Sequence, residues 1–182
     1  MARLGKVPVL DPSSPEEARE MIKFAFDLSE EFQVPVMVRP AIRICHARQN
    51  IEYDVLENNL TKADFKREPS RWASTPKFRF LQHKALNEKH VKISERFNTL
   101  TPFNMHTLEK KKTYPFGIVT GGVPSSVVRD MFKEYQREDI PILKLGAPYP
   151  FPEKLADEFM DACEKVLVIE ETDTVIEYML RD

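Results

Sequence analysis

The sequence contains only two cysteines, Cys45 and Cys163, which lie far apart and form no Cys-x-x-Cys motif. Two thiols are too few to hold an iron–sulfur cluster, and their pattern favours two reduced buried residues over a disulfide. The histidines offer no alternative, because His83, His90 and His106 show no metal-ligand spacing with one another or with the cysteines. The sequence therefore predicts no metal site.

Long apolar runs and an excess of one charge are also lacking. No apolar run approaches the roughly 20 residues needed to span a bilayer, and residues 1 to 9 lack the apolar stretch of a signal peptide. The formal net charge of −2 gives no overall attraction to nucleic acid or to an anionic membrane. We therefore expect a globular cytoplasmic protein with no nucleic-acid or membrane partner.

The first clear element is a helix that begins after Ser14. Ser14 is the expected N-cap, Pro15 suits the first helical position, and Glu17 completes a capping box. The apolar residues that follow recur at helical spacing and predict one buried stripe. Its members are Ala18, Met21, Ile22, Ala25, Leu28 and Phe32.

Extended segments at residues 7–10 and 36–38 flank this helix, and we expect the second to be a short buried strand. A strand–helix–strand unit buries both faces of its strands only within a larger parallel sheet. Residues 1–50 supply at most two strands, so the rest of that sheet is expected to lie outside this stretch.

Residues 51–112 are interpreted as a connecting segment. Residues 50–77 are polar and irregular, with Trp72 as a possible anchor, and residues 78–98 predict a long surface helix covering a sheet edge. Five phenylalanines are interpreted as packing residues: Phe24, Phe26, Phe32, Phe78 and Phe80.

The last block, residues 113–182, alternates strand and helix. Strands are expected at 116–120, 142–145 and 166–169, and helices at 125–136 and 152–162. Such alternation builds right-handed crossovers, so we expect an open Rossmann-like domain with a parallel sheet. Thr172 and Asp173 are expected to open a final helix whose buried stripe is Val175, Ile176 and Met179.

Two stretches at predicted strand ends contain groups that could bind an anion. Thr120, Gly121 and Gly122 lead from a strand into a helix, whose free amides could bind an anion; the alternative is a tight turn without a ligand. Neither the dinucleotide-binding fingerprint nor the P-loop is present.

The second stretch follows the strand at 36–38, where open parallel sheets place their ligands. There Arg39, Arg43 and His46 could bind a substrate carboxylate, with interdomain salt bridges as the alternative.

Acidic residues follow the strand at 166–169. Glu170, Glu171 and Asp173 could form an acid/base pair or a magnesium site. Because carboxylates suit the positive end of a helix, helix capping is the favoured interpretation.

Particular segments resemble one enzyme family. VPVLDPSSPEEA at 7–18, VPVMVR at 34–39 and RICH at 43–46 look like the end of the pyrimidine-binding domain of thiamine-diphosphate-dependent 2-oxoacid:ferredoxin oxidoreductases. FGIVTG at 116–121 and VLVIEE at 166–171 are similar to the transketolase C-terminal-like domain of the same enzymes. Their order matches the alpha subunit of the indolepyruvate:ferredoxin oxidoreductases.

The resemblance implies an α/β chain in three parts. Residues 1–50 would be an incomplete strand–helix–strand piece of the pyrimidine-binding domain, 51–112 a connecting segment, and 113–182 a truncated transketolase C-terminal-like domain. The implied activity is oxidative decarboxylation of aryl 2-oxoacids such as indolepyruvate on thiamine diphosphate with magnesium. Electrons would pass through 4Fe-4S clusters to ferredoxin, and the acyl group to coenzyme A.

The sequence departs from the complete family pattern. It lacks the Gly-Asp-Gly and Asn of the diphosphate–magnesium site, the glutamate that activates the pyrimidine, and the cluster cysteines. No catalytic residue is therefore assigned, and we expect no cofactor on this chain alone and the remaining domains or subunits as partners. The alternatives are a free-standing Rossmann-like nucleotide- or anion-binding module and a non-catalytic structural subunit.

Overall fold

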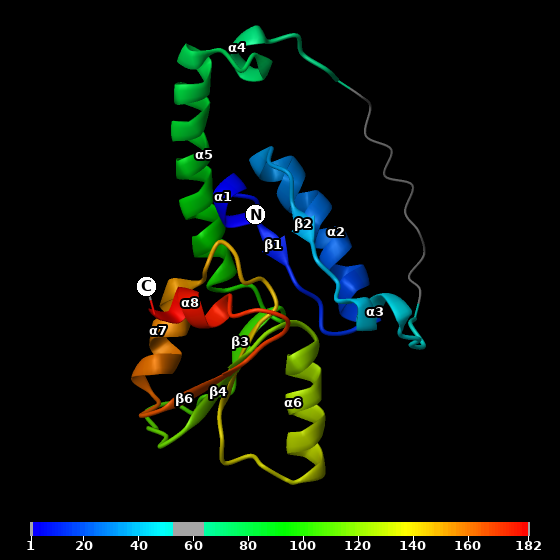
Figure 1. Cartoon of the computed structure of the whole chain (residues 1–182), viewed down its shortest axis with the longest axis vertical. Helices are drawn as coiled ribbons and strands as arrows, with labels where there is room; N and C mark the ends of the chain where they lie inside the picture. The colour runs from blue at the N-terminus through cyan, green and yellow to red at the C-terminus, as the bar shows by residue number, and fades with distance from the viewer. Residues whose placement is uncertain (1, 53–63, 182) are drawn as a thin grey trace.

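The computed structural model describes residues 2–52 and 64–181 as a mixed α/β chain (Figure 1). The first block contains α1 (Ala2–Gly5), β1 (Val9–Leu10), α2 (Pro15–Phe32), β2 (Met37–Val38) and α3 (Ile42–His46). The middle contains α4 (Pro69–Trp72), α5 (Pro76–Phe97) and β3 (Asn104–His106). The last block contains β4 (Gly117–Thr120), α6 (Gly122–Glu134), β5 (Ile142–Leu145), α7 (Glu153–Asp161), β6 (Val166–Ile169) and α8 (Ile176–Arg181).

Helix α2 begins as its sequence predicts. The hydroxyl of Ser14 accepts a hydrogen bond from the Glu17 amide at 3.1 Å, which confirms the N-cap. The Glu17 carboxylate accepts a hydrogen bond from the amide of Ser13 at 2.7 Å, so the capping box closes one residue earlier than expected.

The predicted burial of Ile22 is wrong, because its side chain is 48% exposed. A helix turns about 100° per residue, which places Ile22 at the margin of the apolar stripe.

The two short strands β1 and β2 pair in parallel, with Val9 opposite Met37. The other edge of β1 binds the chain that follows β5: the Val9 amide donates to the Tyr149 carbonyl at 2.6 Å and the Asp11 amide to the Gly146 carbonyl at 2.7 Å. These two backbone hydrogen bonds therefore join the first block to the last. The prediction that 36–38 is buried was wrong for Met37, which is 39% exposed, because among the described strands β2 has a neighbour on one side only.

The larger sheet has the strand order β3-β5-β4-β6. Strand β4 pairs in parallel with β5 and with β6, which confirms the predicted parallel arrangement for these three strands. Strand β3 pairs antiparallel with β5 and comes from the segment predicted to be a connection. Helix α6 begins at Gly122, three residues before its predicted start.

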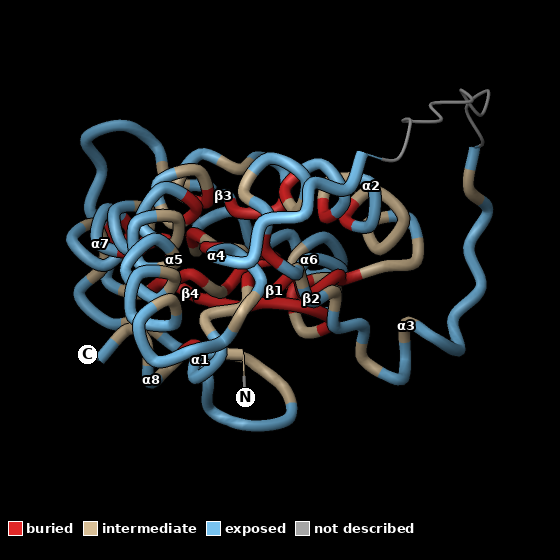
Figure 2. The backbone as a smooth tube through the Cα atoms, turned by 90° about the horizontal axis from the view of Figure 1, so that it is seen from above, coloured by how far each residue is buried: buried red, intermediate tan, exposed pale blue. Residues whose placement is uncertain are grey.

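Two apolar clusters form the interior, and the buried parts of the backbone run through the middle of the molecule (Figure 2). The first joins α2 to the last turns of α5 through Met21, Leu28, Ile93 and Phe97. The second covers the larger sheet, with Phe159 of α7 fully buried.

Only the carboxyl end of α5 reaches this interior, and its first half projects beyond the rest of the chain (Figure 1). Trp72 is 57% exposed. Phe26 and Phe80 are 70% and 73% exposed, so their prediction as packing residues was wrong. In the described part of the chain, no helix combines the length and apolar character needed to cross a membrane.

Candidate functional site

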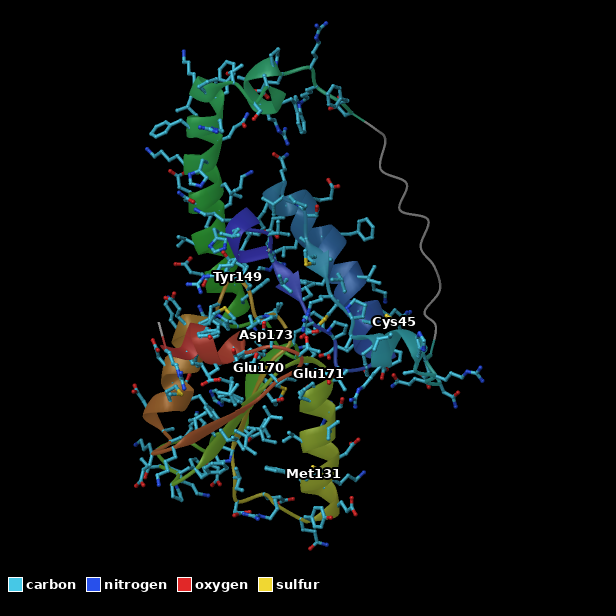
Figure 3. All side chains as sticks on the ribbon, viewed as in Figure 1. Cys45, Met131, Tyr149, Glu170, Glu171 and Asp173 are labelled. Carbon is cyan, nitrogen blue, oxygen red and sulfur yellow. The ribbon has the colours of Figure 1, made fainter. Side chains whose placement is uncertain are left out.

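A cleft of about 500 Å³ lies where the first block meets the last. Its charged lining includes Asp11 and Arg39 from the ends of β1 and β2, and Glu171 from the loop after β6. Its apolar walls include Val9, Met37, Pro148, Tyr149, Ile176 and Met179. Figure 3 labels Tyr149, Glu170, Glu171 and Asp173 around this region.

Asp11 is the buried charged group of the cleft, with 8% of its surface exposed. An Nη atom of Arg39 donates to its Oδ2 at 2.7 Å, whereas its Oδ1 is buried without a hydrogen-bond partner. Burial raises the pKa of the Asp11 carboxyl, and the Arg39 guanidinium opposes that rise. The neighbouring Glu171 carboxylate adds to the increase in pKa.

The predicted anion-binding loop lies against this carboxylate. Gly122 has a φ of +53°, and a Cβ there would come within 2.7 Å of the Asp11 Oδ2. A Cβ at Gly121 would lie 2.7 Å from the Leu145 carbonyl oxygen. Thr120 is fully buried, and its hydroxyl has no hydrogen-bond partner. The positive end of α6 therefore faces a carboxylate of the chain itself, and binding of an external anion stays a prediction.

Two of the three residues predicted to bind a substrate carboxylate contact carboxylates of the chain itself. Arg39 pairs with Asp11, and Arg43, 71% exposed, lies 3.9 Å from Glu171. Both contacts fit the salt-bridge alternative. The cleft lining includes Arg39 but neither Arg43 nor the exposed His46.

Glu170 caps helix α8, which confirms the favoured interpretation of this acid. Its carboxylate accepts hydrogen bonds from the amides of Val175, Ile176 and Glu177 at 2.8 to 3.1 Å. The prediction that Thr172 and Asp173 open the helix was therefore wrong, because Glu170 reaches forward over the loop. Val175 is 52% exposed and does not join the buried stripe.

The donor set of a metal or cluster site is not assembled here. Among residues 2–52 and 64–181, no group of three His, Cys, Asp or Glu side chains is placed to hold a metal ion. Cys45 is exposed and Cys163 is half-buried, and both are free thiols. In the described part of the chain, these two thiols do not form the cysteine set that an iron–sulfur cluster requires.

Sequence reasoning missed Asp11 as a site residue. One feature of the sequence could have indicated it: the aspartate directly follows the apolar strand Val9–Leu10. Ligands of open α/β sheets bind at the carboxyl ends of such strands. The sequence did identify Gly121 and Gly122 as a candidate anion-binding turn. Their position beside Asp11 is set by the fold and could not be read from the sequence.

The fold is that of a segment of a 2-oxoacid:ferredoxin oxidoreductase. A solved structure of 2-oxoglutarate:ferredoxin oxidoreductase from Magnetococcus marinus, with 2-oxoglutarate, coenzyme A and succinyl-CoA bound, matches 96% of this chain with a TM-score of 0.66. The match covers 36% of that chain at 15% sequence identity, and so it shows the fold alone.

The sequence is similar to indolepyruvate oxidoreductase subunit IorA. The protein from Thermococcus kodakarensis is 37% identical over 99% of this chain, and that from Methanothermobacter marburgensis is 35% identical over 97%. The chain spans 28% of the length of each of these relatives. No family model matches the chain. The predicted resemblance to a segment of the indolepyruvate oxidoreductase alpha subunit is confirmed.

Substitution of Gly122 by alanine should destabilise the fold. A side chain at φ +53° is strained, and its Cβ would press on the Asp11 carboxylate. We expect Gly122→Ala to lower the free energy of unfolding by about 2 to 4 kcal/mol in denaturant titration. The control is Gly5→Ala, where the nearest atom outside the chain neighbours lies 3.4 Å away. Equal losses for the two variants would refute this account.

The raised pKa of Asp11 predicts a specific pH dependence. Because the folded state retains this proton to higher pH than the unfolded state, its contribution to stability is complete below the ordinary pKa of 3.8. It is lost as the pH rises through the raised pKa. The free energy of unfolding of the wild type, minus that of Asp11→Asn, should therefore decrease between about pH 3 and pH 7. A constant or increasing difference would contradict the assignment.

Proposed function

We propose that this chain acts as a segment of an oxidoreductase that oxidatively decarboxylates aryl 2-oxoacids such as indolepyruvate to acyl-CoA, with ferredoxin as electron acceptor. The observation that carries the proposal is similarity to IorA over nearly the whole chain, at up to 37% identity. The likeness in fold to a 2-oxoacid:ferredoxin oxidoreductase supports it. Since the chain spans 28% of those relatives, turnover requires further domains or subunits.

Within that enzyme the segment would hold two domains together. The proposed pyrimidine-binding piece at residues 1–50 is bound to the proposed transketolase C-terminal-like block through the Val9–Tyr149 and Asp11–Gly146 backbone hydrogen bonds. The Lys144 ammonium on β5 pairs with Glu17 of α2, and both side chains are largely buried. Removing either partner would leave a poorly solvated charge, so this ion pair fixes the orientation of the two parts.

The cofactors belong to the complete enzyme in this proposal. Thiamine diphosphate with magnesium would supply carbon–carbon bond cleavage, and 4Fe-4S clusters would carry the electrons. Because the chain spans 28% of the length of its relatives, the proposal assigns the binding of these groups to other segments. Ferredoxin, coenzyme A and a cytoplasmic location are part of the same proposal.

The binding of thiamine diphosphate tests the proposal directly. In titration calorimetry with magnesium present, we expect no binding to the chain alone and saturable binding once the remaining domains or subunits are added. Binding of thiamine diphosphate to the isolated chain would refute the proposal that other segments bind this cofactor. Saturable binding of a nucleotide to the isolated chain would instead favour a free-standing Rossmann-like module.

Arg39, Arg43 and His46 remain the proposed contacts for a substrate carboxylate, and the two that lie outside the Asp11 ion pair are Arg43 and His46. Both are exposed, so a substrate held by other segments would have access to them. In the complete enzyme, Arg43→Ala should raise the Michaelis constant for an arylpyruvate by about tenfold, the typical effect of losing a charged hydrogen bond. His46→Ala should raise it less. The control is Arg137→Ala, which removes an exposed cation paired with Asp139. An unchanged Michaelis constant in both variants would rule out this role.

A further inference from the structure

The cleft between the first and last blocks leaves large apolar side chains exposed. Met37 on β2, Val175 before α8 and Tyr178 on α8 line it, and they are 39%, 52% and 59% exposed. The sequence predicts burial for Met37 and Val175, so the described chain leaves uncovered two side chains whose pattern is that of a covered surface. Exposed apolar side chains that gather at one hollow indicate a binding site for another molecule.

The polar part of the cleft combines two carboxylates with one guanidinium. Burial raises the pKa of the Asp11 carboxyl, and the Glu171 carboxylate raises it further, because two negative charges near each other repel. Arg39 compensates only the Oδ2 of Asp11, whereas Oδ1 is buried without a hydrogen-bond partner. Arg43 lies 3.9 Å from Glu171, which is beyond hydrogen-bonding distance. A group with a positive charge and several N–H donors would therefore stabilise this pair of carboxylates.

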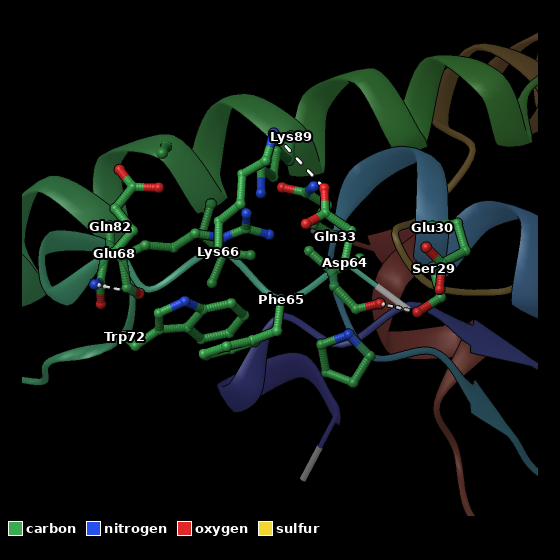
Figure 4. A pocket seen from close by; sticks show the side chains of 15 residues that line it. Ser29, Glu30, Gln33, Asp64, Phe65, Lys66, Glu68, Trp72, Gln82 and Lys89 are labelled. Carbon is green, nitrogen blue, oxygen red and sulfur yellow. Dashed lines mark hydrogen bonds and ion pairs between the residues drawn. The ribbon is translucent and has the colours of Figure 1, made fainter. Parts of the chain in front are cut away.

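Another hollow that could take an aromatic ligand lies between α5 and the end of α2 (Figure 4). It has a volume of about 1100 Å³, and the rings of Phe65 and Trp72 lie 5.8 Å apart in its lining. Among the described residues, the buried side-chain atoms without a hydrogen-bond partner belong to Asp11, His90 and Thr120, and none of these lines that groove. The unpartnered acceptor of Asp11 therefore favours the smaller cleft as the ligand site.

We propose that this smaller cleft binds an α-amino acid with an aromatic side chain. The ammonium of the ligand would lie beside Asp11 and Glu171. Its carboxylate would bind Arg39, whose guanidinium gives one of its five N–H donors to Asp11 and whose side chain is 49% exposed. Because the two charged groups of an amino acid share one carbon, their partners must lie close together, as the 2.7 Å contact between Arg39 and Asp11 places them.

The aromatic ring of the ligand would cover the apolar side of the cleft. Met37 and Met179 offer sulfur contacts to a ring, and Tyr149 adds an aromatic surface. The cleft volume of about 500 Å³ falls within the range of small-molecule sites. A 2-oxoacid has no N–H donor for the two carboxylates, so the cleft would select the amino acid over the corresponding 2-oxoacid.

Binding at the cleft needs only this chain, whereas a regulatory role for it rests on the proposed function. The ligand would be the amino acid that corresponds to the 2-oxoacid substrate. Bound where the first block meets the last, it would stabilise the folded chain through its free energy of binding. The complete enzyme would thereby sense the amine counterpart of its own substrate.

The test is titration calorimetry of the chain with L-tryptophan, tryptamine, indole-3-propionate and glycine at about pH 7. We expect L-tryptophan to bind saturably with a dissociation constant below about 1 mM. Tryptamine lacks the carboxylate and indole-3-propionate lacks the ammonium, so each should bind about tenfold more weakly. Glycine lacks the ring and should give no saturable heat. Equal affinity for L-tryptophan and indole-3-propionate would contradict the proposal.

Two variants locate the ligand. Glu171→Gln removes one carboxylate and should weaken L-tryptophan about tenfold without weakening indole-3-propionate, which has no ammonium. Trp72→Ala, in the groove of Figure 4, should weaken neither. Circular dichroism checks that both variants remain folded. No saturable binding of L-tryptophan up to about 10 mM would overturn the proposal, and so would binding that Trp72→Ala weakens and Glu171→Gln does not. None of these measurements involves turnover or thiamine diphosphate, so the site can fail its test while the proposed function holds.

Discussion

The burial of the Asp11 carboxylate is the constraint on which the rest of the structure depends. Its backbone amide joins β1 to the chain after β5, its Oδ2 binds Arg39 at the end of β2, and the start of α6 closes over it at Gly122. Desolvation opposes the charged form, whereas the Arg39 guanidinium favours it. Each of these elements contacts the same residue, through its backbone amide or its carboxylate, so a change at Asp11 affects both blocks.

Much of the secondary structure could be predicted from local sequence. Ser14 and Pro15 fix the start of α2, and the alternation after residue 113 gives three parallel strands with their helices. The capping role of Glu170 also follows from local chemistry, because an acid at a strand end precedes a helix. These features depend on residues close to one another in the chain.

The remainder depends on contacts between distant residues. Strand β3 has no apolar run, and its buried Asn104 is satisfied instead by the Phe97 carbonyl and the backbone of Ala147. The exposure of Phe80 could not be predicted. A sequence does not show whether an aromatic residue lies on a buried face or on a helix that projects from the core. The role of Asp11 required knowing which loop lies opposite β1.

The backbone bridge between Val9 and Tyr149 links residues 140 positions apart in the chain. Closing so long a loop costs conformational entropy before the contact gives any stability, so topologies of this kind fold slowly. During synthesis β1 cannot form its hydrogen bonds to the segment after β5 until that segment has left the ribosome. The sequence suggests a boundary between residues 1–50 and residues 113–182. The two parts are not expected to fold independently, because β1 is hydrogen-bonded to the segment after β5.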